Sequence, residues 1–242
     1  MTLKKYFPFV SIIMPAKNAA KYIEEAIESF LNQSYKNSEL IIINDGSTDE
    51  TEKIVCLFKN EFPERIKIIK NQISKGIPIS RNKGLNIAKG ELIGHLDSDD
   101  RLHKNAIKKL VKAFSKDKAI VLAHSGYIKI NGDGEKISKH FVKNDGINDI
   151  IKGWQHFGLY KKDIALNIGG FNEKLITCSD GDLFVKIAKG NKIKPVNKKL
   201  YFYRWHESNI GHKRKYCPEC DKKEYCQYYS EWANFNKFKD NH

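Results

Sequence analysis

Four consecutive residues, Asp97-Ser98-Asp99-Asp100, carry three carboxylates and follow the apolar run 92–96. The run predicts a buried β-strand, so the carboxylates lie where that strand ends and the chain turns. In open α/β sheets, ligands bind at the carboxyl ends of the strands. Three negative charges at one turn repel one another, and a divalent cation bound through oxygen relieves that repulsion. The alternative is a solvated turn whose Asp residues cap the next helix.

The composition is that of an ordinary globular chain with a strongly basic balance. The 242 residues include 43 Lys and Arg against 29 Asp and Glu, a formal net charge of +14. This charge predicts an anionic partner, such as nucleic acid, an acidic membrane or a phosphorylated substrate, unless it only solvates the surface. No run of about 18 apolar residues exists, and residues 1–6 do not resemble a secretion signal. We therefore expect a cytoplasmic protein.

Short apolar runs alternate with amphipathic segments over the first hundred residues, which predicts a doubly wound α/β sheet. The predicted strands are 9–14 (ended by Pro15), 39–45, 65–69 and 92–96, and the predicted helices are 21–31, 50–58 and 78–89. Ser47 and Glu50 have the spacing of a capping box for the second helix. No G-x-G-x-x-G follows the first strand and no Walker A sequence occurs, which disfavours the usual dinucleotide site and a P-loop.

The second half of the chain is less regular. The pattern predicts a strand at 119–127, a hairpin at 128–140, a short helix or loop at 145–153, a strand at 156–160, helices at 162–168 and 180–189, and a strand at 196–203. From Gly211 the chain becomes basic, aromatic and cysteine-bearing. We therefore expect one domain over residues 1–210 and an appendage over residues 211–242.

Several polar motifs, in this order and spacing, resemble the family 2 glycosyltransferases of the GT-A fold. They are Pro15–Asn18, Asp45–Asp49, Ser80–Gly84, Asp97–Asp100, Gly169–Glu173, Asp180–Asp182 and Tyr203–His206. The resemblance covers about residues 8–210, and residues 156–210 are also similar to the second half of bacterial chondroitin-polymerase-type transferase domains. It implies a Rossmann-like mixed sheet flanked by helices. It also implies inverting transfer of a hexosyl or N-acetylhexosaminyl group from a nucleotide-diphosphate sugar, typically a UDP-sugar, to a glycan or lipid-linked acceptor.

The resemblance implies a nucleotide-sugar site at the strand ends. Asp45 matches the residue that accepts a hydrogen bond from the base, a role that suits a carboxylate because it only accepts. Arg81 matches a residue that approaches the phosphate or the base. The other matched positions are Pro15, Ala16, Asn18, Asp97 and Ser98. An Asx-turn at Asp45 and a solvated helix residue at Arg81 remain open alternatives.

The resemblance also implies a divalent cation, manganese or magnesium, that bridges the diphosphate oxygens. Asp99 matches the direct metal ligand of the D-x-D motif, and His206 matches a C-terminal histidine that completes the metal or diphosphate site. Lys75 and Arg204 are further candidates for positive charge at the diphosphate. A structural role is the alternative for His206, and a surface role for Lys75.

The base that takes the acceptor proton is matched by Asp180. The family usually has Glu-Asp at this place, whereas this chain has Ser179-Asp180. Asp182 is the nearby alternative, and Asp180 is also consistent with a helix cap. Aromatic residues before this helix, Trp154 and His156, stand where the family places acceptor contacts, while we expect Tyr160 in the core.

The tail carries Cys217, Cys220 and Cys226 beside His212, which together could supply a tetrahedral structural zinc site. Free thiols are the alternative. The basic, aromatic tail also suits peripheral contact with the inner face of an anionic membrane. Two other functions compete with glycosyl transfer. A sugar-phosphate nucleotidyltransferase would need a glycine-rich loop after the first strand, and a non-catalytic nucleic-acid-binding protein leaves the acidic motifs unexplained, so we expect no nucleic acid partner.

Overall fold

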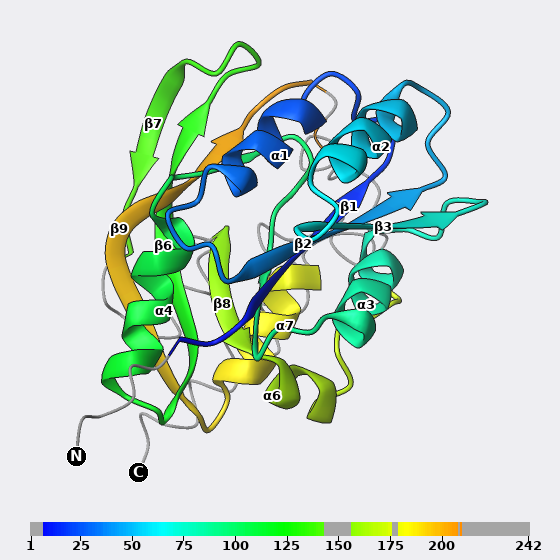
Figure 1. The fold of residues 1–242 in the computed structure, drawn as a ribbon. Helices are drawn as coiled ribbons and strands as arrows, with labels where there is room; N and C mark the ends of the chain where they lie inside the picture. The colour runs from blue at the N-terminus through cyan, green and yellow to red at the C-terminus, as the bar shows by residue number, and fades with distance from the viewer. Residues whose placement is uncertain (1–6, 143–155, 176–178, 208, 210–242) are drawn as a thin grey trace, which may run out of the picture.

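The computed structural model describes residues 7–142, 156–175, 179–207 and 209, which form a mixed nine-stranded sheet with helices on both faces (Figure 1). Expectations for residues 145–153, for Trp154 and for the tail at 211–242, with its candidate zinc ligands, lie outside the described residues. No helix in the described ranges has the length and apolar character needed to cross a membrane.

The first half of the chain forms four parallel strands in the order β3-β2-β1-β4. The elements are β1 (Val10–Ala16), α1 (Ile23–Leu31), β2 (Ser38–Asp45), α2 (Thr51–Glu61), β3 (Ile66–Asn71), α3 (Ile77–Ile87) and β4 (Leu92–His95). Every residue of β2 is buried, as its unbroken apolar run predicts for a parallel strand covered on both faces. The predicted alternation of strands and helices is confirmed here.

The prediction that Pro15 ends the first strand is wrong, because β1 continues to Ala16. The β1–β4 ladder ends with the pair Ile13–His95, and the backbone N–H of Leu96 donates to the carbonyl of Ile13. The backbone groups of residues two apart in a strand face the same neighbouring strand, so the nitrogen of Pro15 faces the β4 side, as Ile13 does. At the level of Pro15, however, β4 is no longer paired with β1. A missing donor costs nothing at that position.

The second half of the chain completes the sheet with strands in both directions. Its elements are β5 (Arg101–Leu102), α4 (Ala106–Lys116), β6 (Ile120–Ile130), β7 (Lys136–His140), β8 (Phe157–Lys161), α6 (Lys162–Asn167), α7 (Ser179–Ala188) and β9 (Lys192–Arg204). Strand β8 lies between β4 and β6 and is antiparallel to both. Strand β9 runs parallel to β6 and antiparallel to β5.

Strand β9 begins four residues earlier than the predicted strand at 196–203. Its first part carries the exposed lysines Lys192 and Lys194, so this part lacks the apolar pattern by which a strand is predicted from sequence. The pairing with β6 defines it instead, because Lys192 is in register with Ile120 and Lys194 with Ala123. The long β6 pairs with β8 through its first half and with β7 through its second.

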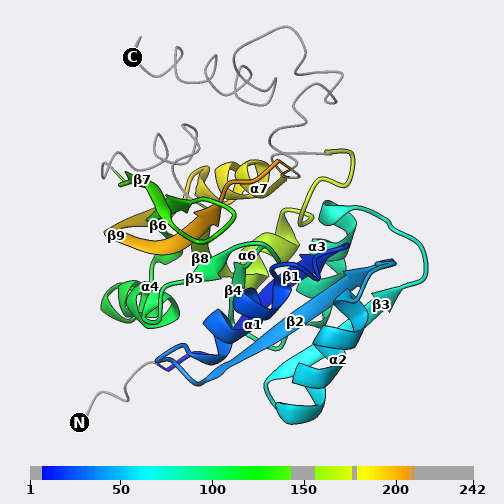
Figure 2. The same ribbon diagram turned by 90° about the horizontal axis from the view of Figure 1, so that it is seen from above.

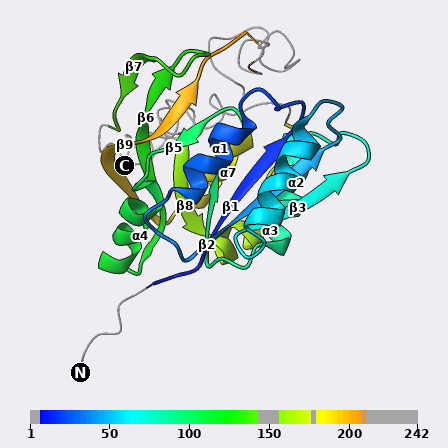
Figure 3. The same cartoon turned by 45° about the horizontal axis from the view of Figure 1, so that its top comes forward.

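Helices α1, α2 and α4 cover one face of the sheet, and α3, α6 and α7 cover the other (Figure 3). Gly84 sets how closely α3 approaches the sheet. A Cβ atom there would lie 2.6 Å from a methyl of Ile13 and 3.0 Å from one of Ile43. Because only glycine permits this approach, Arg81, one turn earlier in α3, is held against the ends of the strands.

Candidate active site

The acidic turn between β4 and β5 is held in place by β9. Oδ1 of Asp100 accepts the backbone N–H of Arg204 at 2.7 Å, and the hydroxyl of Tyr201 accepts the N–H of Asp97 at 3.1 Å. Burial raises the pKa of the Asp100 carboxyl well above its ordinary value, and the charges of Asp99 and Asp97 raise it further. Asp100 is therefore an inward-facing part of the turn, while the partly exposed Asp97 and Asp99 remain available at its surface.

Asp99 and His206 come together although 107 positions separate them in the chain. Oδ2 of Asp99 lies 3.0 Å from Nε2 of His206 and 3.2 Å from Nδ2 of Asn209. The imidazole also packs against the ring of Tyr22, with 4.9 Å between ring centroids. Asn209 was missed by sequence reasoning, because a single asparagine after the histidine carries no recognisable pattern.

A carboxylate oxygen is a donor that manganese and magnesium accept, and the imidazole nitrogen beside it favours manganese, the softer of the two ions. No cluster of three or more His, Cys, Asp or Glu side chains suited to a metal occurs within the described residues. The protein therefore offers few ligands at this place. A divalent cation held by one or two side chains plus phosphate oxygens and water matches such a site.

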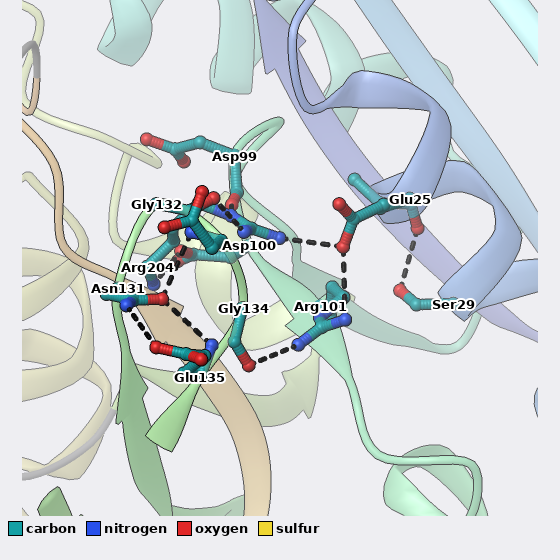
Figure 4. A network of polar contacts seen from close by, with 12 residues as sticks. Glu25, Ser29, Asp99, Asp100, Arg101, Asn131, Gly132, Gly134, Glu135 and Arg204 are labelled. Atoms are coloured by element: carbon teal, nitrogen blue, oxygen red, sulfur yellow. Dashed lines mark hydrogen bonds and ion pairs between the residues drawn. The ribbon is translucent and has the colours of Figure 1, made fainter. Parts of the chain in front are cut away.

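Arg204 is fully buried and does not reach toward a diphosphate, so that prediction is corrected (Figure 4). Its guanidinium donates three hydrogen bonds of 2.8 Å, to the carbonyls of Asp99 and Gly132 and to a carboxylate oxygen of Glu25. These bonds join the acidic turn, the β6–β7 hairpin and α1. Arg204 thus positions the backbone of Asp99 rather than a ligand.

Arg81 connects the acidic turn to the start of α7. Its buried guanidinium donates to Oδ1 of Asp97 at 2.7 Å and to Oγ of Ser179 at 3.2 Å, and it lies 4.0 Å from Oδ1 of Asp180. Burial by itself would lower the pKa of Arg81, but the charges of Asp97 and Asp180 outweigh it and raise that pKa. The alternative of a solvated helix residue is therefore wrong for Arg81.

Two carboxylates in the first turn of α7 have different surroundings. The Asp182 side chain is only 3% exposed and pairs with Lys186 at 2.8 Å. The Asp180 side chain is 37% exposed and stands beside Arg81. Of the two carboxylates, Asp180 is therefore the one that is accessible from solvent.

Asp45 is buried, and both of its carboxylate oxygens already accept hydrogen bonds. The donors are Nδ2 of Asn71, Oγ of Ser74 and the backbone N–H groups of Lys75 and Gly76, at 2.7–2.9 Å. Burial raises the pKa of Asp45, but these four hydrogen bonds outweigh it and lower that pKa overall. Asp45 holds the segment after β3 against the end of β2. The alternative of an Asx-turn at Asp45 is not what the structure has. In the turn after β2, it is Oδ1 of Asn44 that accepts the backbone N–H of Ser47.

The loop after β1 is tied to the loop after β2. Asn18 adopts φ of +48°, a left-handed conformation that asparagine tolerates. Its N–H donates to Oγ of Ser47, and its side chain accepts the N–H of Thr48 at 2.9 Å. The predicted capping box is therefore wrong, because Ser47 is engaged by Asn18 and it is Asp49 that accepts the N–H of Thr51 at the start of α2. Pro15 and Ala16 are buried in β1, whereas Asn18 is exposed.

His156 lies among aromatic rings rather than alone. It stacks on Tyr203 with 4.2 Å between ring centroids and an interplanar angle of 8°, and it meets Tyr127 edge to face at 4.3 Å. Burial lowers the pKa of His156 to about 4, against a smaller raising effect of Asp180. Tyr160 is fully buried and hydrogen-bonds His95 at 2.7 Å, which confirms its predicted place in the core.

Comparison with known families and proteins finds close matches. The family model for glycosyl transferase family 2 matches residues 11–185. Hyaluronan synthase of Pasteurella multocida is 34% identical over 212 residues, which cover 86% of this chain and 21% of that protein. Chondroitin synthase of Escherichia coli is 31% identical over 217 residues, covering 88% of this chain and 31% of that protein. The chain thus spans less than a third of the length of these relatives.

Solved structures agree in fold. TarS of S. aureus, solved in complex with UDP, superposes with a TM-score of 0.69 at 23% identity, covering 85% of this chain and 63% of that chain. The mannosyltransferase PcManGT of Pyrobaculum calidifontis, in complex with GDP-Man and Mn2+, superposes with a TM-score of 0.68 at 19% identity, covering 86% and 60%. The predicted GT-A fold is confirmed by these likenesses.

Proposed function

The chain belongs to glycosyl transferase family 2, and from that membership we propose that it is an inverting, metal-dependent transferase that uses a UDP-sugar. The acceptor is a hydroxyl of a glycan or of a lipid-linked glycan, and the transferred group is a hexose or an N-acetylhexosamine. Glycosyl transfer itself follows from the family.

One observation carries the proposal: Arg81 contacts Asp97 of the acidic turn and lies 4.0 Å from Asp180 at the start of α7. The group proposed to hold the donor and the group proposed to accept a proton therefore border the same guanidinium. A direct displacement needs both partners within reach of one reacting carbon. The closeness of these three side chains supports the proposal on that ground.

In the proposed step, the acceptor oxygen bonds to the anomeric carbon while the bond from that carbon to the diphosphate oxygen breaks. The bonding electrons leave with the nucleotide diphosphate, and the hydroxyl proton passes to Asp180. Attack opposite to the leaving group inverts the anomeric centre. Asp182 is excluded from this role in the proposal because it is buried and paired with Lys186.

Asp99 and His206 would hold manganese or magnesium, with Asn209 beside them. When bound, the cation supplies Lewis acidity that stabilises the negative charge on the leaving diphosphate. Arg204 keeps the carbonyl of Asp99 in place, so the carboxylate starts from a fixed backbone. The complex of PcManGT with Mn2+ supports a divalent cation here as well.

We assign the donor nucleotide to the carboxyl ends of β1, β2 and β4. The residues assigned to it are Pro15, Ala16, Asn18, Asp45, Arg81, Asp97 and Ser98. A direct contact of Asp45 with the base requires that one of its present donors give way, so holding the segment at 71–76 is the role that Asp45 fills without rearrangement. TarS in complex with UDP supports a uridine nucleotide.

The remaining expectations stay proposals. They are a catalytic domain over residues 1–210 with an appendage over 211–242, structural zinc in that appendage, and cytoplasmic localisation with peripheral contact to the inner face of the membrane. The two competing functions are set aside. Family membership accounts for the acidic motifs that a nucleic-acid-binding protein leaves unexplained, and the loop after the first strand lacks the glycines that a nucleotidyltransferase needs.

The proposal is tested with a panel of nucleotide sugars, each incubated with the protein and manganese, magnesium or a chelator. We expect metal-dependent release of UDP from one UDP-sugar, and a loss of about 100-fold or more in Asp99→Ala. Asp133→Ala, which removes an exposed carboxylate at the tip of the β6–β7 hairpin, is the matched control and should retain activity. Full activity of both Asp99→Ala and Asp180→Ala would contradict the assigned roles.

A further inference from the structure

The outer face of α4, together with the residue two positions before the helix, carries exposed lysines and no acid. These side chains, which together form the lysine face, are Lys104, Lys108, Lys109, Lys112 and Lys116. The opposite side of α4 is buried against the sheet. Within the described part of the chain, none of the five ammonium groups pairs with a carboxylate. The lysine face is therefore a positively charged surface without internal neutralisation.

This arrangement of charge works against the helix itself. Lys108 and Lys112 are four positions apart, as are Lys112 and Lys116, so each pair lies together on the helix surface and repels. The first turn of α4 contains Lys108 and no acid, although the helix dipole favours acids there. Burial lowers the pKa of His103, and the charges of Lys104 and Lys109 lower it further. Helix stability does not explain these lysines, whereas an anionic partner facing them does.

An exposed aromatic residue lies beside the lysine face. Phe7 is 58% exposed, although its ring contacts that of Tyr35 with 4.7 Å between the centroids. The carbonyl of Phe7 accepts Nδ2 of Asn37 at 3.1 Å, and the backbone N–H of Ser34 donates to the carbonyl of Lys104 at 2.8 Å. The loop between α1 and β2 therefore joins Phe7 to the start of α4, and Figures 1 and 2 show the start of β1 beside that helix.

The lysine face and the proposed reaction centre are on opposite sides of the sheet. Helix α4 covers the same face of the sheet as α1 and α2, whereas α7, which begins with Ser179 and Asp180, covers the other. Figure 2 shows β6, β8 and β9 between α4 and α7. A surface that binds the lysine face therefore leaves Asp180 uncovered.

We propose that the lysine face and Phe7 together bind the surface of an anionic phospholipid bilayer. The ammonium groups lie against the lipid phosphates, and the ring of Phe7 enters the boundary between headgroups and acyl chains. The exposed ring favours a bilayer over a nucleic-acid duplex, because the outer surface of a duplex is phosphate and offers no apolar layer. The inference rests on the peripheral membrane contact proposed above, and it adds the surface that makes this contact.

The test measures binding of the whole chain to vesicles by sedimentation at low ionic strength. The vesicles consist of phosphatidylcholine alone or of an equal mixture of phosphatidylcholine and phosphatidylglycerol. The double variant Lys108→Gln/Lys112→Gln is compared with Lys53→Gln/Lys89→Gln, which removes two exposed lysines outside α4 and changes the net charge equally. Phe7→Ser probes the apolar contact, and thermal unfolding checks that each variant is folded.

We expect the wild type to bind the anionic vesicles more tightly than the neutral ones. Lys108→Gln/Lys112→Gln should lose about tenfold in affinity for the anionic vesicles, because each lysine near such a surface adds to the attraction, while the control variant changes little. Phe7→Ser should weaken this binding several-fold. Equal affinities of the two double variants would overturn the inference. Unchanged vesicle binding by Phe7→Ser would also overturn it, because a face that binds through charge alone fits a nucleic acid equally well.

Metal-dependent hydrolysis of the donor is measured without vesicles on the same preparations, so the proposals fail separately. Hydrolysis should be equal in the wild type and in all of these variants, since α4 and Asp180 lie on opposite sides of the sheet. Absent hydrolysis contradicts the proposed glycosyl transfer whatever the vesicles do. A wild type that ignores anionic vesicles contradicts the membrane contact as a whole, whereas equal binding by the two double variants contradicts only the lysine face.

Discussion

Nη2 of Arg81 donates to Oδ1 of Asp97 at 2.7 Å, which fastens a buried cation of α3 to the carboxylate that follows β4. A double-mutant cycle of Arg81→Met and Asp97→Asn should measure this contact. We expect Arg81→Met alone to lower the free energy of unfolding by about 3 kcal/mol, because it leaves polar partners without their donor. The coupling between the two substitutions should be about 1–3 kcal/mol.

The exposed pair of Lys70 and Glu52 is the matched control for that cycle, since its nitrogen and oxygen lie 2.6 Å apart on the surface. Its coupling in the cycle of Lys70→Met and Glu52→Gln should stay below about 1 kcal/mol. Equilibrium unfolding in urea measures all the variants. If the coupling free energy of Arg81 and Asp97 is no larger than that of the surface pair, burial does not strengthen this ion pair.

Asp180→Asn and Asp182→Asn should affect different properties. Because Asp180 is the reachable carboxylate, its substitution should lower kcat by about 100-fold or more while unfolding is unchanged. Asp182→Asn removes the partner of Lys186 and should lower stability by about 1 kcal/mol with most of kcat retained. Steady-state transfer assays and thermal unfolding of both variants measure this, and the reverse pattern would assign the base to Asp182.

Stability should fall in mild acid partly through His156. Its pKa is lowered from the ordinary 6.5 to about 4 in the folded protein, chiefly by burial. Folding therefore opposes protonation, so the contribution of His156 is complete above pH 6.5 and is lost as the pH falls to about 4. His156→Phe keeps a ring in the stack but cannot take up a proton.

Unfolding of the wild type and of His156→Phe should be measured from pH 7.5 to pH 4. We expect the difference between the two curves to shift in favour of the variant as the pH falls. Asp97 and Asp100, whose pKa values are raised by burial, act in the opposite direction, but both proteins share them. Parallel curves would mean that the imidazole is as easily protonated in the folded state as in the unfolded one.

Arg204 should be irreplaceable by lysine. Its planar guanidinium donates hydrogen bonds to two carbonyls and to Glu25 at once. The lysine side chain is shorter and ends in a single ammonium, which cannot donate to all three acceptors in these positions. Arg204→Met should cost about 3–5 kcal/mol, and Arg204→Lys should recover little of it. Arg101→Lys, which alters a partly exposed neighbour of the same Glu25, should cost less than about 1 kcal/mol. Urea unfolding of the three variants decides between these expectations.

The parts of the fold that could be predicted from sequence are those set by local pattern. The unbroken apolar run of β2 indicated a strand covered on both faces, and Asp97–Asp100 at the end of β4 indicated a site at the edge of the sheet. Each depends only on neighbouring residues. Where the pattern was weak, as in the lysine-bearing start of β9, pairing with β6 defines the strand instead.

The parts that could not be predicted depend on distant residues. Arg204 looked available for a diphosphate, yet its bonds to α1 and to the β6–β7 hairpin join residues that are 179 and 72 positions apart in the chain. Asp45 matched a base-binding residue, but nothing near it in sequence revealed that Asn71 and the segment after it would occupy both of its oxygens. Asn209 likewise could not be identified from its neighbours in sequence, because its contact with Asp99 joins residues 110 positions apart.

The place of β8 between β4 and β6 has a consequence for biosynthesis. Until Phe157–Lys161 has been synthesised, the backbone donors and acceptors of Leu92–Gly94 have no neighbour on that side. Strand edges left open in this way recruit other polypeptides. Translation therefore passes through a vulnerable interval that closes only after Phe157–Lys161 leaves the ribosome, and truncated products ending before it should precipitate or require a chaperone.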